Sequence, residues 1–398
     1  MKQTNRSRQP FVARASLSSA FAHVKQAGVS LVELMIALVL GSVLSVAIVQ
    51  LFVANSETYN LLQGQSRMQE SARFALSFIG GSIRKAGYRG CMSASDAVST
   101  TLVNWDAVPY EFDLQQGVEG YNGAAGGAWS PSLAALPATI GGVDTNVFAT
   151  PAGVGASAGV DTDAVIPGTD VLTLRNISQN EQRVSANMSN STLPVTIGTP
   201  GSWGYVLDEL VMIYDCEKGS VFRITNIQIG VPTATESTIS HGIASVDATR
   251  NSDPRLTTID TYQTDAAVSA IETNVFFIAP GAGLNKSGNA PLSLWRKSGL
   301  NAPVELVEGV ENLQVLFGVD VDEDGTPNRY TQAPIADWTT VRTVRVTIVA
   351  NSIDPVGGTS MPSHGCEVQD CVDGDADGTR DELIRRAFTQ TFHLRNRG

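Results

Sequence analysis

The stretch that decides the fold is residues 28–54, GVSLVELMIALVLGSVLSVAIVQLFVA. Its one charged residue is Glu33, and no side chain from residue 34 to residue 54 carries a charge. About 20 apolar residues are enough to cross a bilayer as a helix, because each residue adds 1.5 Å. The sequence therefore predicts a membrane-spanning helix near the N-terminus, over residues 29–54.

The residues before this stretch are basic. Their positive charges come from Lys2, Arg6, Arg8, Arg14 and Lys25. No Asp or Glu precedes residue 33. By the positive-inside rule, residues 1–28 stay in the cytoplasm and the large C-terminal part is exported. A plain signal anchor would satisfy this pattern. A cleaved secretory signal fits less well, because its apolar run is only about 7–15 residues long.

The spacing of Gly28 and Glu33 suggests a third interpretation. A carboxylate drawn toward the bilayer centre costs roughly 2.5–3.5 kcal/mol on insertion scales, so a lone acid here is a functional candidate. Residues 28–33, GVSLVE, resemble the prepilin peptidase site of type IV pilins and type II secretion pseudopilins. Those families usually have Phe where Val29 stands. The resemblance implies cleavage after Gly28 by a prepilin peptidase and methylation of the new N-terminus at Val29.

The same resemblance implies a role for Glu33 in assembly. Cleavage leaves an α-ammonium group on Val29 in apolar surroundings, where a buried charge needs a partner. The family's filaments imply that Glu33 of one subunit pairs with the N-terminus of a neighbour and sets the axial register. The alternative is that Glu33 simply lies in the lipid headgroup layer.

Charge and cysteine content describe the exported part. The chain of 398 residues has 27 basic and 39 acidic side chains; without the five basic residues of the leader, 22 basic remain and the net charge becomes −17. This argues against direct nucleic-acid binding. Cys91, Cys216, Cys366 and Cys371 permit two disulfides in an exported chain. Local closure favours Cys366–Cys371, which leaves Cys91–Cys216; reduced core cysteines are the alternative.

The predicted helix continues beyond the membrane span as an amphipathic segment, residues 55–90. Apolar residues recur there at helical spacing. They are Leu61, Met68, Ala72, Ala75, Ile79 and Ile83. Gly64, Gly80 and Gly81 each weaken the helix by about 1 kcal/mol relative to Ala. Gly87 and Gly90 are expected to end it.

Residues 66–91, SRMQESARFALSFIGGSIRKAGYRGC, resemble the PilW family of type IV pilus minor pilins. The resemblance implies incorporation at the pilus tip or in the initiating complex, after residence in the inner membrane as a single-pass protein. The implied partners are other minor pilins, the major pilin and the tip-associated adhesin. The alternatives are a J-type minor pseudopilin of type II secretion and, in another class, a membrane-anchored calcium-dependent adhesive protein.

The predicted head, residues 91–398, is rich in strands. Residues 92–170 read as a loop with Gly and Ala crowded at 121–160, and short strands are expected at 101–105 and 145–148. Alternating patterns then predict further strands. These lie at 171–175, 209–214, 220–227, 274–278, 292–297, 304–319, 340–349 and 388–394. The expected fold is α+β and type IV pilin-like, with one long N-terminal helix laid across an antiparallel sheet.

Two acidic loops are candidate calcium sites. Residues 320–328, DVDEDGTPN, and residues 373–381, DGDADGTRD, share the pattern D-x-D-x-D-G. Alternating carboxylates in a tight loop can converge on Ca²⁺, which prefers six to eight oxygen ligands. The candidate ligands are Asp320, Asp322, Asp324 and Asn328, then Asp373, Asp375, Asp377 and Asp381. The alternative is a solvated acidic turn without metal, since the twelfth-position Glu of the EF-hand is replaced by Thr331 and Ile384.

No catalytic constellation is expected. Of the four histidines, His23 lies in the leader, and His241, His364 and His393 have no ligand spacing with one another. Residues 155–159 match G-x-S-x-G, but a nucleophile elbow needs a strand before it and a helix after it. Residues 281–287 lack the strand–helix context of a phosphate loop and are expected to form a hairpin turn. The sequence thus indicates a protein that acts by assembly, not by turnover.

Overall fold

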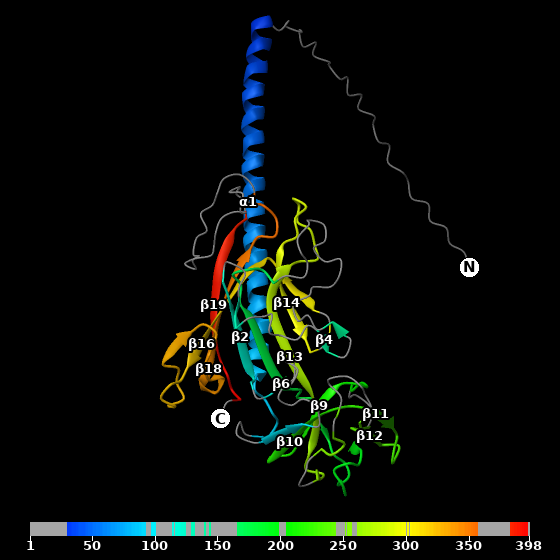
Figure 1. The fold of residues 1–398 in the computed structure, drawn as a ribbon. Helices are drawn as coiled ribbons and strands as arrows, with labels where there is room; N and C mark the ends of the chain where they lie inside the picture. Colours follow the sequence, from blue (N-terminus) through cyan, green and yellow to red (C-terminus); the bar gives the residue numbers. More distant parts are fainter. Residues whose placement is uncertain are drawn as a thin grey trace, which may run out of the picture. The chain divides into compact units, whose positions relative to one another are not determined.

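The computed structural model describes residues 30–92, 97–100, 114, 116–124, 129–131, 139–140, 143–144, 165–198, 204–243, 251, 253–256, 261–299, 301, 303–356 and 383–396. By its internal contacts the chain divides into two compact units, Met1–Ser56 and Glu57–Gly398. Figure 1 shows one long helix, α1, and a head built from strands.

Helix α1 runs from Leu31 to Lys85 and contains no proline. Its first turn carries Glu33 and its last turn carries Arg84 and Lys85, which is the charge distribution that the helix dipole favours. The helix ends as predicted before Gly87, whose positive φ of 76° suits a glycine. The Gly87 N–H then donates to the Arg175 carbonyl at 2.8 Å, which attaches the end of the helix to the head.

Within the first unit the helix is apolar and exposed. Leu31 and Phe52 are both 73% exposed. The most apolar 18-residue window has a mean hydropathy of 2.6, and none of it is buried. By length and composition this is a segment that can cross a membrane.

Within the second unit one face of α1 is buried. Met68, Ala72, Ala75, Leu76, Ile79, Gly80 and Ile83 are its buried residues. They include the predicted stripe from Met68 to Ile83, while Leu61 is half-buried. The main hydrophobic core joins this face to side chains from two sheets, such as Leu174, Phe276 and Val346. The α+β fold is therefore the one expected from the sequence, with head sheets that are antiparallel except for the parallel pair of β1 (Ala97–Thr100) and β10 (Lys218–Arg223).

The larger sheet has ten strands, in the order β1-β10-β9-β13-β6-β2-β3, with β14, β15 and β7 attached off this path. Its main strands are β2 (Val118–Gly123), β6 (Val171–Ile177), β9 (Leu210–Tyr214), β10 (Lys218–Arg223), β13 (Ala267–Pro280), β14 (Leu292–Ser298) and β15 (Val304–Glu308). The short ones are β1 (Ala97–Thr100), β3 (Trp129–Ser130) and β7 (Gln182–Arg183). Strand β13 is the central strand of this sheet, because its first part pairs with β9 and its second part pairs with β6 and β14.

The second sheet has four antiparallel strands in the order β17-β16-β18-β19. These are β16 (Val310–Val319), β17 (Arg329–Thr331), β18 (Val341–Asn351) and β19 (Arg385–His393), and a 3₁₀ helix, η5 (Trp338–Thr340), precedes β18. On β18, Val344, Val346 and Ile348 enter the core, and Arg345 and Thr347 point to the other face. This is the alternation that the sequence predicted for 340–349.

A further three-stranded sheet has the order β11-β12-β8. Its strands are β8 (Val195–Gly198), β11 (Asn226–Ile229) and β12 (Glu236–Ser240). A separate core cluster joins it to β9, β10 and β13 through residues such as Ile197, Phe222 and Val268. The sequence did not predict this sheet. A two-stranded pair, β4 (Thr139–Ile140) and β5 (Val143–Asp144), completes the described strands.

Three of the predicted boundaries were wrong. Residues 220–227 cover the end of β10 and the start of β11, which belong to different sheets. Residues 304–319 form two strands in different sheets, because Gly309 adopts a φ of +75° and turns the chain between β15 and β16. Residues 92–170 are also more than a loop, since β2 pairs with β6. A Cβ on Gly120 would lie 2.4 Å from the ring of Phe317, so a glycine here marks close packing and not a loop. The strands expected at 101–105 and 145–148 lie outside the described residues.

Candidate functional sites

The N-terminal end of α1 is the first candidate site. Glu33 is exposed in the first turn, and the Leu34 N–H donates to the Ser30 carbonyl at 3.0 Å. Glu33 forms no ion pair within the described part of the chain. Gly28 and Val29, the predicted cleavage position, lie outside the described residues. A carboxylate in the first helical turn suits the helix dipole, and it is also free to meet a partner.

The second half of α1 presents apolar side chains that do not pack on the head. Tyr59 is 66% exposed, Leu62 59%, Phe74 46% and Phe78 44%. At 100° per residue, Tyr59, Phe74 and Phe78 lie on the side of the helix away from the buried stripe, whereas Leu62 lies at the edge of the stripe, in the direction of Gly80. Exposed apolar residues grouped on one surface mark interaction sites more often than scattered ones do. We call Tyr59, Phe74 and Phe78 the outer apolar face of α1.

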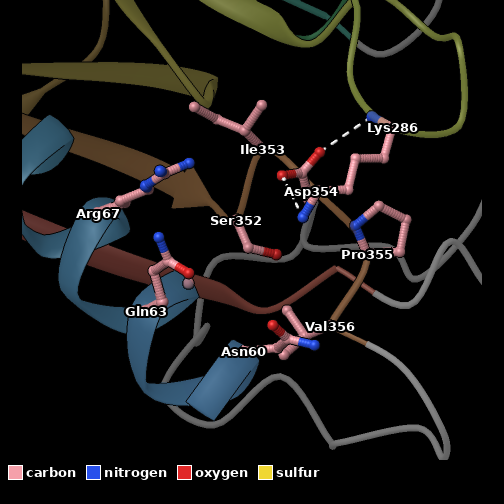
Figure 2. A pocket seen from close by; sticks show the side chains of 10 residues that line it. Asn60, Gln63, Arg67, Lys286, Ser352, Ile353, Asp354, Pro355 and Val356 are labelled. Atoms are coloured by element: carbon pink, nitrogen blue, oxygen red, sulfur yellow. Dashed lines mark hydrogen bonds and ion pairs between the residues drawn. The ribbon is translucent and has the colours of Figure 1, made fainter. Parts of the chain in front are cut away.

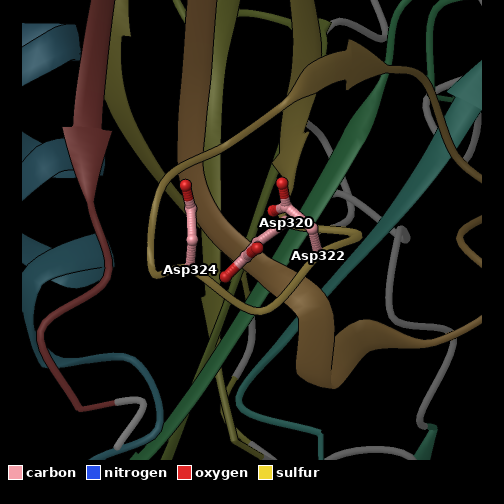
Figure 3. A group of neighbouring side chains, drawn as sticks. All are labelled: Asp320, Asp322 and Asp324. Carbon is pink, nitrogen blue, oxygen red and sulfur yellow. The ribbon is translucent and has the colours of Figure 1, made fainter.

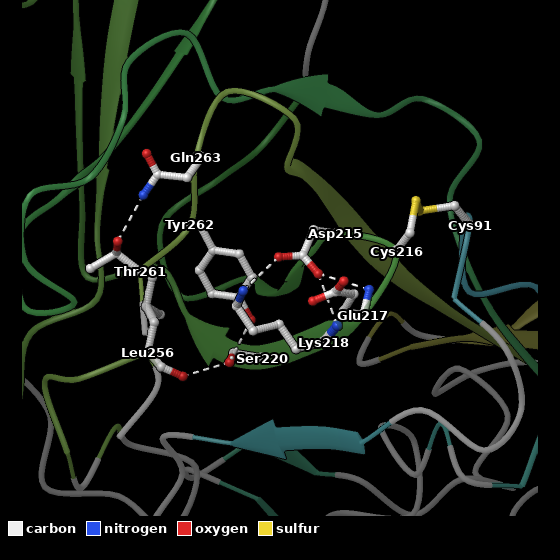
Figure 4. A network of polar contacts seen from close by, with 10 residues as sticks. All are labelled: Cys91, Asp215, Cys216, Glu217, Lys218, Ser220, Leu256, Thr261, Tyr262 and Gln263. Carbon is white, nitrogen blue, oxygen red and sulfur yellow. Dashed lines mark hydrogen bonds and ion pairs between the residues drawn. A yellow bond between two sulfur atoms is a disulfide. The ribbon is translucent and has the colours of Figure 1, made fainter. Parts of the chain in front are cut away.

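A disulfide joins Cys91, just after the helix, to Cys216 in the turn between β9 and β10, with the two Cα atoms 4.9 Å apart (Figure 4). This is the pairing left when Cys366 and Cys371 close locally. The bridge closes a loop of 125 residues, and long loops gain most from cross-linking in the chain-entropy description. Cys366 and Cys371 lie outside the described residues.

Polar contacts fix the turn that holds Cys216 (Figure 4). Asp215 Oδ1 accepts the Glu217 and Lys218 N–H groups, each at 2.9 Å, and Oδ2 pairs with Lys218 Nζ at 2.8 Å. Burial raises the pKa of the Asp215 carboxyl, but its hydrogen bonds, led by that from Lys218, outweigh this and lower the pKa overall. Several polar contacts therefore hold the turn between β9 and β10 where the disulfide attaches.

The first acidic loop connects β16 to β17 (Figure 3). One carboxylate oxygen from each of Asp320, Asp322 and Asp324 lies within 4.8 Å of the other two. Asp320 is buried and pairs with Arg342 Nε at 2.9 Å. Asn328 Oδ1 accepts the Val321 N–H at 2.7 Å, so this predicted ligand closes the loop on itself. The other loop, with Asp373, Asp375, Asp377 and Asp381, lies outside the described residues.

A small pocket of about 150 Å³ lies between α1 and the chain that follows β18 (Figure 2). Asn60, Gln63 and Arg67 line it from the helix. On the other side, Lys286 Nζ pairs with Asp354 Oδ2 at 3.1 Å. The lining is mainly polar, and Lys286 and the three polar helix residues are exposed, which suits water or a passing side chain better than a buried ligand.

The described histidines have structural surroundings. His241 is buried, and its Nε2 lies 2.8 Å from the Leu193 carbonyl oxygen. His393 is exposed at the end of β19. Residues 281–287 lie between β13 and β14, and the Asn285 N–H donates to the Asn289 carbonyl at 2.8 Å, which makes a hairpin turn as predicted. His23, His364 and residues 155–159 lie outside the described residues.

Several buried charged groups escaped prediction, and Arg175 and Asp170 are the clearest of them. Arg175 on β6 has no exposed side-chain surface and pairs with Glu119 on β2 at 2.7 Å. Asp170, just before β6, accepts the Gly123 N–H at 2.9 Å and the Val315 N–H at 2.7 Å. Both tie strands that are distant in sequence. The only local signal was a charged residue beside an apolar strand, which is equally common at a strand end on the surface.

Comparison with known families agrees with this geometry. Residues 24–49 match the family model described as Prokaryotic N-terminal methylation motif. Residues 275–396, from the second part of β13 to the end of β19, match the model described as Type IV Pilus-assembly protein W. No curated protein and no solved structure matches the chain.

A long apolar N-terminal helix with a methylation motif and an antiparallel head define a type IV pilin-like protein. Within that class, the chain is a PilW-like minor pilin associated with type IV pilus assembly. The motif and the family indicate a membrane-anchored protein that is processed by a prepilin peptidase and interacts with other pilus components. The matched family is one of structural, not catalytic, proteins.

Proposed function

We propose that this chain is incorporated at the tip, or in the initiating complex, of type IV pili and there supports pilus assembly. Its partners in this proposal are the other minor pilins, the major pilin and the tip-associated adhesin. Before assembly it is a single-pass protein of the inner membrane with a periplasmic head, and afterwards it is part of the pilus at the cell surface. Adhesion, twitching or DNA uptake would follow from the pilus as a whole.

The observation that carries the proposal is the two-part character of α1. Its first part is apolar and exposed from Leu31 onward, while its second part is anchored in the head by the stripe from Met68 to Ile83. A 55-residue helix is about five times the mean length in globular proteins, so a head alone does not account for it. A helix that exchanges lipid contacts for contacts with other helices in a filament does account for it.

Glu33 supports the same proposal. After cleavage behind Gly28, the α-ammonium of Val29 needs a partner in apolar surroundings. In our proposal the Glu33 carboxylate of a neighbouring subunit supplies it and sets the axial register of the subunits. Glu33 has no ion-pair partner among the described residues of its own chain, as this role requires.

The first test is the N-terminus of the mature protein. Mass spectrometry of protein recovered from membranes and from sheared pili is expected to find N-methylated Val29 as the first residue. An intact leader in both fractions would contradict pilin processing and favour a plain membrane anchor. If processing is normal but deletion abolishes protein secretion and leaves pilus number unchanged, the J-type pseudopilin alternative is correct.

The second arm tests Glu33. We expect Glu33→Ala to be cleaved normally but to be depleted from sheared pili by at least severalfold, because the amine of a neighbour loses its partner. Glu57→Ala is the matched control, since Glu57 is also an exposed acid on α1. Incorporation of Glu33→Ala at the level of the control would contradict the register role.

A further inference from the structure

We propose that the loop at residues 320–328 binds calcium through the carboxylates of Asp320, Asp322 and Asp324. The loop connects β16 to β17 in the part of the head that matches the pilus-assembly family. The inference is independent of the proposed function, because it concerns cation binding by the head and not assembly.

The three carboxylates have the separation that one calcium ion requires. Ca²⁺–oxygen distances are about 2.3–2.6 Å, so two oxygens bound to one ion lie at most about 5 Å apart. One oxygen of each Asp lies within 4.8 Å of the other two. The three oxygens are therefore close enough to share a single ion. Figure 3 shows the three side chains on the loop.

A second observation comes from the buried member of the set. The Asp320 side chain has no exposed surface. Its Oδ2 accepts the Gly325 N–H at 3.0 Å and Arg342 Nε at 2.9 Å. Its Oδ1 is also buried but has no hydrogen-bond partner in the described part of the chain. Buried polar atoms are nearly always satisfied, and a bound cation would supply the partner that this oxygen lacks among the described residues.

The charge balance points the same way. Three carboxylates stand close together, and the ion pair with Arg342 compensates only one of them. Asp322 and Asp324 are exposed, and Asp324 Oδ1 accepts both the Thr326 N–H and the Thr326 hydroxyl, which leaves its other oxygen for a ligand. Adjacent carboxylates repel each other unless a cation or a proton intervenes.

The donor set selects the kind of ion. All three ligands are hard carboxylate oxygens, which suit Ca²⁺ or Mg²⁺ and not zinc or copper. Ca²⁺ tolerates irregular geometry and completes its shell with backbone carbonyls and water, whereas Mg²⁺ requires near-ideal octahedral geometry. With two of the three carboxylates exposed, the affinity is expected to resemble that of extracellular modules, about 10⁻⁴–10⁻³ M.

The test uses the full-length chain in detergent micelles, stripped with EDTA and titrated with Tb³⁺, whose luminescence is excited through tryptophan. Trp338 is a suitable donor, because Thr340 of the same 3₁₀ helix accepts the Asp320 N–H through its carbonyl at 2.9 Å. We expect saturable luminescence from bound Tb³⁺. We also expect Ca²⁺ to displace Tb³⁺ at lower concentration than Mg²⁺ does. Failure of Ca²⁺ to displace Tb³⁺ would overturn the proposal.

The variant to compare is Asp322→Asn/Asp324→Asn, which spares the buried Asp320–Arg342 pair and so protects folding. It is expected to weaken Tb³⁺ binding at least tenfold. Asp265→Asn, another exposed acid of the head, is the matched control and should bind as the wild type does. Equally strong Tb³⁺ binding by the double variant would overturn the proposal and place the ion elsewhere. Weaker binding by Asp375→Asn/Asp377→Asn would then assign the ion to the second acidic loop.

Discussion

Asp170 shows how a single residue can make the head sensitive to pH. Its two carboxylate oxygens accept N–H groups from Gly123 at the end of β2 and from Val315 on β16. Burial raises the pKa of Asp170 to about 6, although both hydrogen bonds act to lower it. The folded state therefore binds a proton between about pH 4 and pH 6 that the unfolded state does not bind.

This predicts a gain in stability on mild acidification. A raised folded-state pKa gives stability that is fully present below the unfolded pKa of 3.8 and is lost as the pH rises through about 6. Between pH 7 and pH 5 the wild type should gain about 1 kcal/mol relative to Asp170→Asn, which does not titrate. Thermal unfolding of both proteins at the two pH values measures this. A difference in melting temperature that is the same at both values would contradict it.

At the level of the residue, the sequence predicted the groups that stand out from their neighbours. Glu33 was visible because it is the lone acid before an apolar run, and the alternating Asp residues of 320–324 were visible as a pattern. Asp170 and Arg175 were not, because their importance comes from partners 47 to 145 positions away. Such partners are fixed by strand pairing, which no local pattern specifies.

Among the elements, α1 contains two adjacent glycines with opposite roles. A Cβ on Gly80 would lie 2.3 Å from the ring of Phe392 on β19, whereas a Cβ on Gly81 would meet nothing within 4 Å. From the sequence alone, both glycines are expected to weaken the helix to the same extent. Only the packing of β19 against α1 shows that Gly80 is required for close approach and that Gly81 is not.

The pair gives a matched prediction. Gly81→Ala should stabilise the protein by up to about 1 kcal/mol, because alanine is the better helix former and the space is open. Gly80→Ala gains the same helix propensity but forces Phe392 to move, and overpacking of this kind costs about 1–3 kcal/mol. Thermal or chemical unfolding of the two full-length variants would show the ranking. Equal effects of the two substitutions would contradict the packing of Phe392 on Gly80.

At the scale of the whole molecule, the spacing of apolar residues predicted the long helix and the antiparallel strands of the head. The division of the head into sheets did not. β13 runs for 14 residues because it serves two sets of neighbours, β9 at one end and β6 with β14 at the other. The sheet of β8, β11 and β12 was missed because its strands are short and polar on one face. These features depend on contacts between distant strands, which the sequence does not encode locally.

The last prediction concerns the role of the outer apolar face of α1 in pilus assembly. Phe74 and Phe78 are nearly half exposed although they lie in the part of the helix that belongs to the head. We expect Phe74→Ser/Phe78→Ser to lower the melting temperature of the head by no more than about 5 °C, because both rings are nearly half exposed and neither belongs to the main hydrophobic core. The same variant should be processed normally and yet be depleted from sheared pili. It can no longer bury two aromatic rings against another helix, so it loses the stabilisation which that burial provides.

Ile229→Ser is the matched control for this variant. Ile229 is 69% exposed on β11, so its substitution removes apolar surface from the head without touching α1. Quantitative immunoblots of sheared pili against whole cells would compare the three proteins. If Ile229→Ser and the double variant are depleted alike, loss of apolar surface in general explains the effect; if neither is depleted, the outer face of α1 remains exposed to solvent in the pilus. Depletion of the double variant alone is what a helix packed against other subunits along its full length requires.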